Sequence, residues 1–213
     1  SIINVCWENP NAENNSERLL VKNKIAETWE ANSSLKFVGW DICGTSSKGI
    51  RIKIADETPH TKELGSELNG MPNGMLLNFT FSKWCPICQK NRKFYIESIA
   101  VHEFGHALSF SHEQNRSDAP WCGKEAQGQN GDIYITPYDL YSVMNYCNPI
   151  YAGAGDLSDG DIKGLHKYYG KNSFSQGNLN SLLRISYSLD NRSIYKELQG
   201  NPSRYSKKTL ELK

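Results

Sequence analysis

The sequence lacks a long apolar run and lacks a surplus of charge of either sign. A membrane-spanning helix needs about 20 consecutive apolar residues, and no such run occurs. The 24 basic and 23 acidic side chains leave a formal net charge of +1. This balance gives no general electrostatic reason to bind nucleic acid or an anionic membrane surface. We therefore expect no nucleic-acid partner and no membrane span.

The first ten residues, SIINVCWENP, lack the basic start and the apolar stretch of a signal peptide. We therefore expect either a cytosolic chain or a mature form whose leader has been removed. The six cysteines favour the second choice, because an even number suits three disulfides in an exported protein. Many pairings are possible, and the one we predict is Cys6–Cys43, Cys85–Cys88 and Cys122–Cys147.

The Cys85 and Cys88 pair, in WCPICQK, allows two other interpretations. A zinc ribbon would need a second Cys-x-x-Cys pair nearby, and the sequence has none. A thioredoxin-like redox pair would open a helix after a strand, whereas a proline lies between these cysteines and the polar QKNRK follows. A structural disulfide fits this context better.

The pattern of apolar residues predicts an α+β fold. Residues 16–32 have apolar side chains at helical spacing behind Ser16, a suitable N-cap. Glycine and proline punctuate residues 58–74, which predicts a loop. Runs of β-forming residues predict three strands, at 35–40, 49–56 and 74–81.

A second long helix is predicted at 94–110, where an apolar stripe recurs at helical spacing without proline. Regular patterning then fades, and residues 113–137 are polar with glycines and prolines. A last helix is predicted at 157–170, capped by Ser158 with Asp161 three residues later. The aspartates here could also suggest calcium, but the twelve-residue calcium loop with its terminal glutamate is absent.

Three of the five histidines fall within HEFGHALSFSH, residues 102–112. Residues four apart differ by about 400° around a helix, so His102 and His106 share one face. His112 can join them only if the chain leaves the helix and turns back at Ser109, in a conformation that glycine adopts most easily. Zinc favours imidazole nitrogen, and a catalytic zinc keeps three protein ligands and one open position. We therefore predict Zn²⁺ bound by these three histidines.

Glu103 lies about 100° around the helix from His102, so it can reach a water beside the metal without binding the metal itself. Two alternatives stay open. The histidines could simply pack on an amphipathic helix, or two of them could bind zinc together with a distant glutamate. A third histidine at this spacing favours the three-histidine site.

Residues 102–112 resemble the extended zinc motif of the metzincin metallopeptidases, His-Glu-x-x-His-x-x-Gly-x-x-His. The sequence departs from the motif at the glycine, which is Ser109 here. A second signature of that group is a methionine-bearing turn beneath the metal, and SVMNY (142–146) resembles it, with Met144 as the floor and Tyr146 after it.

Within the metzincins, the chain most resembles the astacin family. Astacins have a glutamate directly after the third histidine, and Glu113 stands there. They also have Ser-x-Met-His-Tyr at the turn, from which Asn145 departs. Serralysins share a similar turn and tyrosine, so the group is better supported than the family. The clear resemblance covers roughly residues 94–170.

The resemblance implies a metzincin-type catalytic domain, with a mixed twisted sheet, an amino-terminal helix, an active-site helix and an irregular lower subdomain. We place this domain at 1–170. Residues 171–213, rich in Ser, Asn and Lys, are predicted to be an extension or the start of an appended module. The implied function is a secreted zinc endopeptidase with Glu103 as general base. We expect a protein or peptide substrate and a monomer.

The family resemblance also implies roles for individual residues. Tyr146 would ligate zinc at rest and move toward the oxyanion during reaction, and Glu113 would contact the mature amino terminus. GMLLNFTF (74–81) resembles the edge strand on which an extended peptide aligns. Two other functions are considered: a zinc-containing binding or toxin module that does not cut, and another metzincin with a narrow substrate. Glu103 disfavours the first, because a structural zinc site needs no base.

Overall fold

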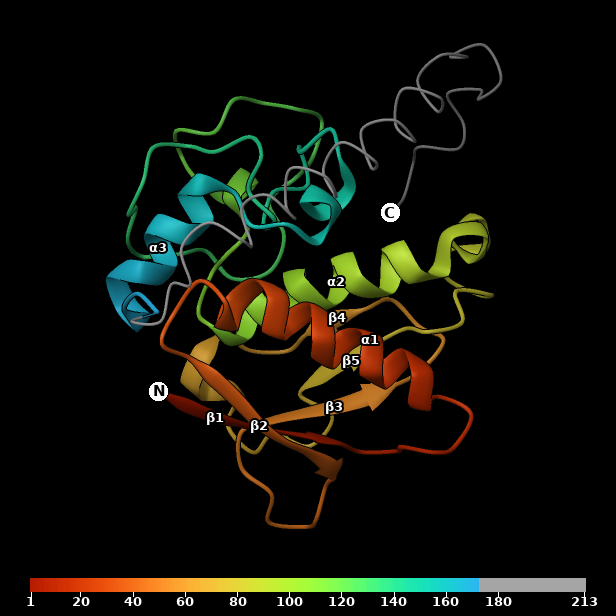
Figure 1. Cartoon of the computed structure of the whole chain (residues 1–213). Helices are drawn as coiled ribbons and strands as arrows, with labels where there is room; N and C mark the ends of the chain where they lie inside the picture. The colour runs from red at the N-terminus through yellow and green to blue at the C-terminus, as the bar shows by residue number, and fades with distance from the viewer. Residues whose placement is uncertain (173–213) are drawn as a thin grey trace, which may run out of the picture. The chain divides into compact units, whose positions relative to one another are not determined.

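The computed structural model describes residues 1–172 (Figure 1). The predicted extension therefore lies outside the described residues, except for its first two positions, and the domain boundary stays a prediction. Within the described part, helices cover one face of a sheet, and a long irregular segment leads from the second long helix to the last one. The predicted α+β class is confirmed.

The sheet has five strands in the order β2-β1-β3-β5-β4. Four of them are parallel, and only β4 runs antiparallel, to β5. The sheet is therefore mixed, as predicted, and β4 forms one of its edges. The strands are β1 (Ile2–Trp7), β2 (Lys36–Ile42), β3 (Ile50–Ile54), β4 (His60–Thr61) and β5 (Met75–Leu77).

Two long helices lie side by side over the sheet (Figure 1). The first, α1 (Asn15–Ile25), continues as a π-helical turn that contains Trp29. The second is α2 (Arg92–Ala107). The fully buried Trp29 indole donates to the Val101 carbonyl oxygen, 3.0 Å away, which ties the two helices together. The last helix is α3 (Asp159–Tyr169).

The start of the last helix was predicted correctly from its local signals. Ser158 Oγ accepts a hydrogen bond from the Asp161 amide at 3.0 Å, and the Asp161 carboxylate accepts one from the Ser158 amide at 2.9 Å. This is the reciprocal capping arrangement expected from the sequence. The N-cap predicted for α1 was wrong, because that helix begins at Asn15 and the Ser16 hydroxyl donates to Glu17 instead.

The strand predictions need four corrections. The strand β1 was not predicted, and β4 lies inside the segment predicted to be a loop. The strand predicted at 74–81 covers only β5, because the Asn78 side chain accepts from the amides of Thr80 and Phe81 and turns the chain. Finally, β5 is paired on both sides, so the sheet edge that an extended peptide could join is β4.

All three predicted disulfide pairs are present, including Cys85–Cys88. That pair is therefore a disulfide here and not half of a zinc ribbon. No helix within residues 1–172 is long and apolar enough to cross a membrane.

Candidate metal centre

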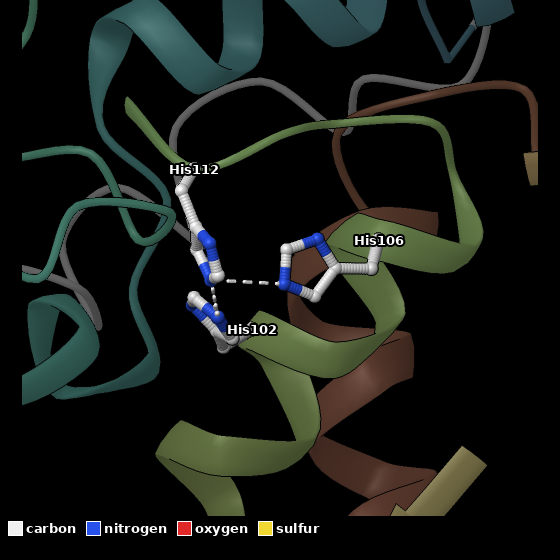
Figure 2. A group of neighbouring side chains, drawn as sticks. All are labelled: His102, His106 and His112. Atoms are coloured by element: carbon white, nitrogen blue, oxygen red, sulfur yellow. Dashed lines mark hydrogen bonds between the residues drawn. The ribbon is translucent and has the colours of Figure 1, made fainter. Parts of the chain in front are cut away.

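Three histidine rings converge at the end of α2 (Figure 2). His102 and His106 lie one turn apart on the helix, and His112 returns to meet them after the helix has ended. The Nε2 atom of His112 lies 3.2 Å from the Nε2 atoms of both His102 and His106. All three rings are buried, with 4%, 8% and 7% exposure for His102, His106 and His112. The predicted convergence is confirmed.

The second nitrogen of each ring fixes where its proton lies. Each Nδ1 atom lies 2.8 Å from a main-chain carbonyl oxygen: Val143 for His102, Phe110 for His106 and Gln127 for His112. Because a carbonyl oxygen only accepts, each Nδ1 carries a hydrogen and donates it. In a neutral ring the Nε2 atom then has a bare lone pair.

Burial keeps these rings neutral. It lowers the pKa of His102 well below its usual value, lowers that of His106 to about 4, and lowers that of His112 as well. Three lone pairs therefore face one another with no proton between them, which is unfavourable unless a cation lies among them. Two nitrogens bound tetrahedrally to one zinc at roughly 2.0–2.1 Å lie about 3.3 Å apart. The observed spacing is close to that value, so the histidines fit zinc.

The turn that returns His112 to the site is a Schellman motif. The Ser109 amide donates to the His106 carbonyl oxygen at 2.9 Å, and the Phe110 amide donates to the Gly105 carbonyl oxygen at 3.0 Å. Ser109 has φ 69°, as the sequence predicted. A non-glycine residue in this conformation costs on the order of 1–2 kcal/mol. The fold tolerates that cost at the position where the metzincin motif has glycine.

Gly65 makes room for the side chain of Ser109. A Cβ atom added at Gly65 would lie only 1.9 Å from Ser109 Oγ. The hydroxymethyl group of Ser109 thus occupies the space that a side chain at position 65 would fill. This contact could not be predicted from local patterns, because the two residues are 44 positions apart.

The methionine-bearing turn lies directly beneath α2. Met144 is 2% exposed, and a Cβ atom added at Gly105 would lie 2.3 Å from its sulfur. Gly105 therefore permits the close approach of the turn to the helix. Met144 as the floor of the site stays a prediction, and the sequence did not identify Gly105.

The capping residue of α3 holds this turn in place. The Asp161 carboxylate accepts from Ser142 Oγ at 2.6 Å and from the Val143 amide at 2.9 Å. The carbonyl oxygen of Val143 is the acceptor for His102 Nδ1. A chain of hydrogen bonds therefore runs from the start of α3 to one of the converging rings. This role of Asp161 was not predicted.

Glu103 lies beside the histidines and is 4% exposed. Burial raises the pKa of its carboxyl group to about 8, while a hydrogen bond from Thr61 acts in the opposite direction. Thr61 Oγ1 donates to Glu103 Oε2 at 2.8 Å. A cation held by the histidines would also lower this pKa, because a positive charge favours the carboxylate. Thr61 was not predicted as a site residue, because it lies in the segment predicted to be a loop.

A cleft of about 260 Å³ opens over these residues. Its walls include residues 58–64, which contain β4, and residues 127–129. Glu103, His106 and Tyr146 line it as well. A larger cavity of about 730 Å³ lies in the irregular region against α3. Glu103 and Tyr146 line only the smaller cleft, so the candidate chemistry is there.

The Tyr146 ring stacks against His102 and packs at a tilt against His112. Its ring centroid lies 4.4 Å from that of His112 and 5.3 Å from that of His102. Within residues 1–172 the phenol hydroxyl has no hydrogen-bond partner. Burial, and then the nearby Glu103 carboxylate, raise the pKa of Tyr146, so the phenol keeps its proton at neutral pH.

Glu113 contacts Asp139 and Arg116, and its contact with a mature amino terminus stays a prediction. Its carboxylate accepts from the Asp139 amide at 2.8 Å and lies 3.5 Å from the Arg116 guanidinium. The ammonium group of Ser1 donates to the Ser34 carbonyl oxygen at 3.1 Å.

No protein-family model and no curated protein matches this sequence. Solved structures do resemble it. Myroilysin has 20% sequence identity and a TM-score of 0.56, over 81% of this chain and 94% of that chain. High choriolytic enzyme 1, a hatching-enzyme zinc protease from the medaka fish Oryzias latipes, has 19% identity and a TM-score of 0.53, over 80% of this chain and 90% of that chain.

These likenesses establish the fold, because almost the whole of each compared chain is covered. They establish nothing beyond the fold, because the sequence identities are low. The chain shares the fold of these two proteins, which agrees with the astacin-like resemblance of its motifs. The converging histidines occupy the end of its central helix.

Proposed function

We propose that this chain is a secreted zinc-dependent endopeptidase in which Glu103 acts as general base. One observation carries the proposal: three neutral imidazoles converge beside a buried carboxylate in the wall of an open cleft. A structural zinc site is closed by a fourth protein ligand. Within residues 1–172, no fourth His, Cys, Asp or Glu joins the group, which leaves a position open for chemistry.

His102, His106 and His112 would hold the zinc ion. Bound zinc supplies Lewis-acid chemistry, since it polarises a carbonyl group and lowers the pKa of water toward about 7. The carbonyl oxygens that accept from the three Nδ1 atoms orient the rings and increase their basicity. They therefore contribute to metal affinity without touching the metal.

The edge of the sheet gives a peptide a place to bind. Among the described strands β4 pairs only with β5, and both of its residues line the cleft. An extended substrate can add to this edge through main-chain hydrogen bonds, which give affinity with little dependence on side chains. The fold of β4 thus supports a protein or peptide substrate.

Two side chains are proposed to handle protons and charge. Glu103 accepts a proton from the attacking water and later delivers it to the leaving amine. Tyr146, whose ring packs against His112 and whose hydroxyl keeps its proton, donates to the oxyanion that develops on the attacked carbonyl group. Secretion is supported by the three disulfides, which form and persist in oxidising compartments.

The function is tested by combining a metal analysis with a peptide-library digest. We expect one zinc per purified chain, cleavage inside peptides, loss of cleavage on treatment with a zinc chelator, and recovery when zinc is added back. Magnesium added back in place of zinc is the control, since hard cations prefer oxygen ligands. A protein that binds zinc and leaves every peptide intact would instead fit the non-cutting binding module.

Replacing Tyr146 with phenylalanine should lower kcat by about a hundredfold, because the lost hydroxyl is an oxyanion donor. The ring still packs against His102 and His112, so zinc content and KM should change little. Steady-state kinetics and elemental analysis check this. The exposed Tyr141→Phe is the matched control. An unchanged kcat in Tyr146→Phe would remove the hydroxyl from the mechanism.

A further inference from the structure

Thr61 is the protein's only hydrogen-bond partner for the Glu103 carboxylate within residues 1–172. Its hydroxyl lies 2.8 Å from Glu103 Oε2 and 3.2 Å from the Glu103 main-chain carbonyl oxygen. We propose that Thr61 is a positioning residue, which fixes the Glu103 carboxylate in the orientation needed for proton transfer. This inference rests on the proposed peptidase function.

The hydrogen bond from Thr61 gives the two oxygens of the Glu103 carboxylate different roles. Oε2 is engaged by Thr61. Oε1 accepts no hydrogen bond from the described residues. It is also not one of the buried polar atoms that lack a partner, so it is accessible to solvent. It therefore faces the cleft, which Glu103 lines. Oε1 is the oxygen available to take a proton from a water there.

Without Thr61, little would hold that orientation. The last torsion of a glutamate side chain is broad and roughly two-fold, so a free carboxylate rotates easily. A general base must lie within about 2.6–3.2 Å of the group that it deprotonates. The hydrogen bond from the Thr61 hydroxyl fixes Oε2 of Glu103 and therefore keeps Oε1 within reach of the reacting water.

The position of Thr61 follows from the pairing of β4. Thr61 lies opposite Met75 and His60 lies opposite Leu76, and the Lys62 amide continues the ladder to the Gly74 carbonyl oxygen. Successive side chains on a strand point to opposite faces. Thr61 therefore points toward α2, whereas its two neighbours point away from it.

This placement links substrate binding to the base. The substrate main chain is proposed to pair with the edge strand β4. The same strand holds the Glu103 carboxylate through the hydrogen bond from Thr61. Pairing with β4 would therefore also fix the position of the peptide relative to the Glu103 carboxylate. A loop residue without a strand's hydrogen bonds would hold the base less firmly.

The competing explanation is that Thr61 only ties β4 to α2 through the Glu103 main-chain oxygen. That role would affect unfolding and leave turnover of the folded enzyme unchanged. The positioning role affects kcat more than KM, because the substrate still binds along β4 while proton transfer becomes slower. The two explanations therefore differ in a measurable ratio.

The test compares Thr61→Val, which keeps the shape and removes the hydroxyl, with Thr61→Ser, which keeps the hydroxyl. We expect Thr61→Val to lower kcat by about ten- to a hundredfold with little change in KM or zinc content, and Thr61→Ser to retain most of the activity. Thr45→Val, at a threonine that is exposed and lies outside the cleft, is the matched control. If Thr61→Val fails to fold, Thr61→Ala replaces it.

Wild-type kcat in Thr61→Val, together with an inactive Glu103→Gln, would overturn the inference and leave the proposed function intact. Crystal structures of the wild type and Thr61→Val add a result that does not depend on turnover. A displaced or disordered Glu103 carboxylate in the variant supports the positioning role. A carboxylate that stays in place refutes it, even if the wild type cleaves no peptide and the proposed function fails.

Discussion

Replacing Glu103 with glutamine should lower kcat by about a thousandfold and leave the zinc content unchanged. Glutamine has the same shape, and its side-chain oxygen can still accept from Thr61, so the Thr61 hydroxyl keeps its hydrogen-bond partner. It cannot accept a proton from water, and general acid–base catalysis contributes roughly 10²- to 10⁴-fold. Steady-state kinetics on a peptide cleaved by the wild type, with elemental analysis, measure both quantities.

Glu97→Gln is the matched control for this experiment. Glu97 lies on the same helix, partly buried, and pairs with Lys93 at 3.8 Å outside the cleft. Its replacement tests whether the loss of a carboxylate from α2 is by itself harmful. A Glu103→Gln variant that turns over at the wild-type rate would show that another group acts as the base.

Replacing His112 with alanine should weaken zinc binding by at least about a hundredfold. Removing groups that merely orient a metal ligand typically costs roughly 10–100-fold in affinity, and a ligand itself contributes more. His112 is the best of the three to remove, because it follows α2 and its loss leaves the helix intact. A competition titration against a chromogenic zinc chelator measures the change.

His166→Ala controls for the loss of one histidine, since His166 lies on α3 and outside the converging group. It should bind zinc as the wild type does. Unchanged zinc affinity in His112→Ala would contradict the three-histidine site. It would favour the alternative in which two histidines on α2 bind zinc together with a distant glutamate.

The parts of the site that the sequence predicted are those set by local geometry. Helical spacing placed His102 and His106 on one face, and the six-residue step to His112 required a turn at Ser109. The reciprocal cap at Ser158 also depends on residues only three apart. Each of these features follows from neighbours in the chain, so no knowledge of distant packing was needed.

The parts that were missed depend on contacts between distant segments. β4 contains only two residues, in a stretch broken by glycine and proline, so no alternation of apolar residues marks it. Its existence depends on pairing with β5. Thr61 becomes a site residue only through that pairing, because the strand carries its hydroxyl to a helix residue 42 positions later.

Asp161 illustrates a prediction that was correct but incomplete. Its role in capping α3 was visible in the sequence, whereas its bonds to Ser142 and Val143 join elements 18 to 19 residues apart. A carboxylate has enough lone pairs for both tasks. The capping role can be predicted from the local sequence, whereas the bonds to Ser142 and Val143 are visible only in the folded chain.

The contact between Gly65 and Ser109 means that the departure from the metzincin motif involves two positions. Restoring glycine at 109 alone would relax the backbone but leave an unfilled hollow the size of a hydroxymethyl group. Enlarging residue 65 alone would drive two side chains into the same volume. Protein engineers who transplant this turn into a related scaffold would therefore have to carry both residues together.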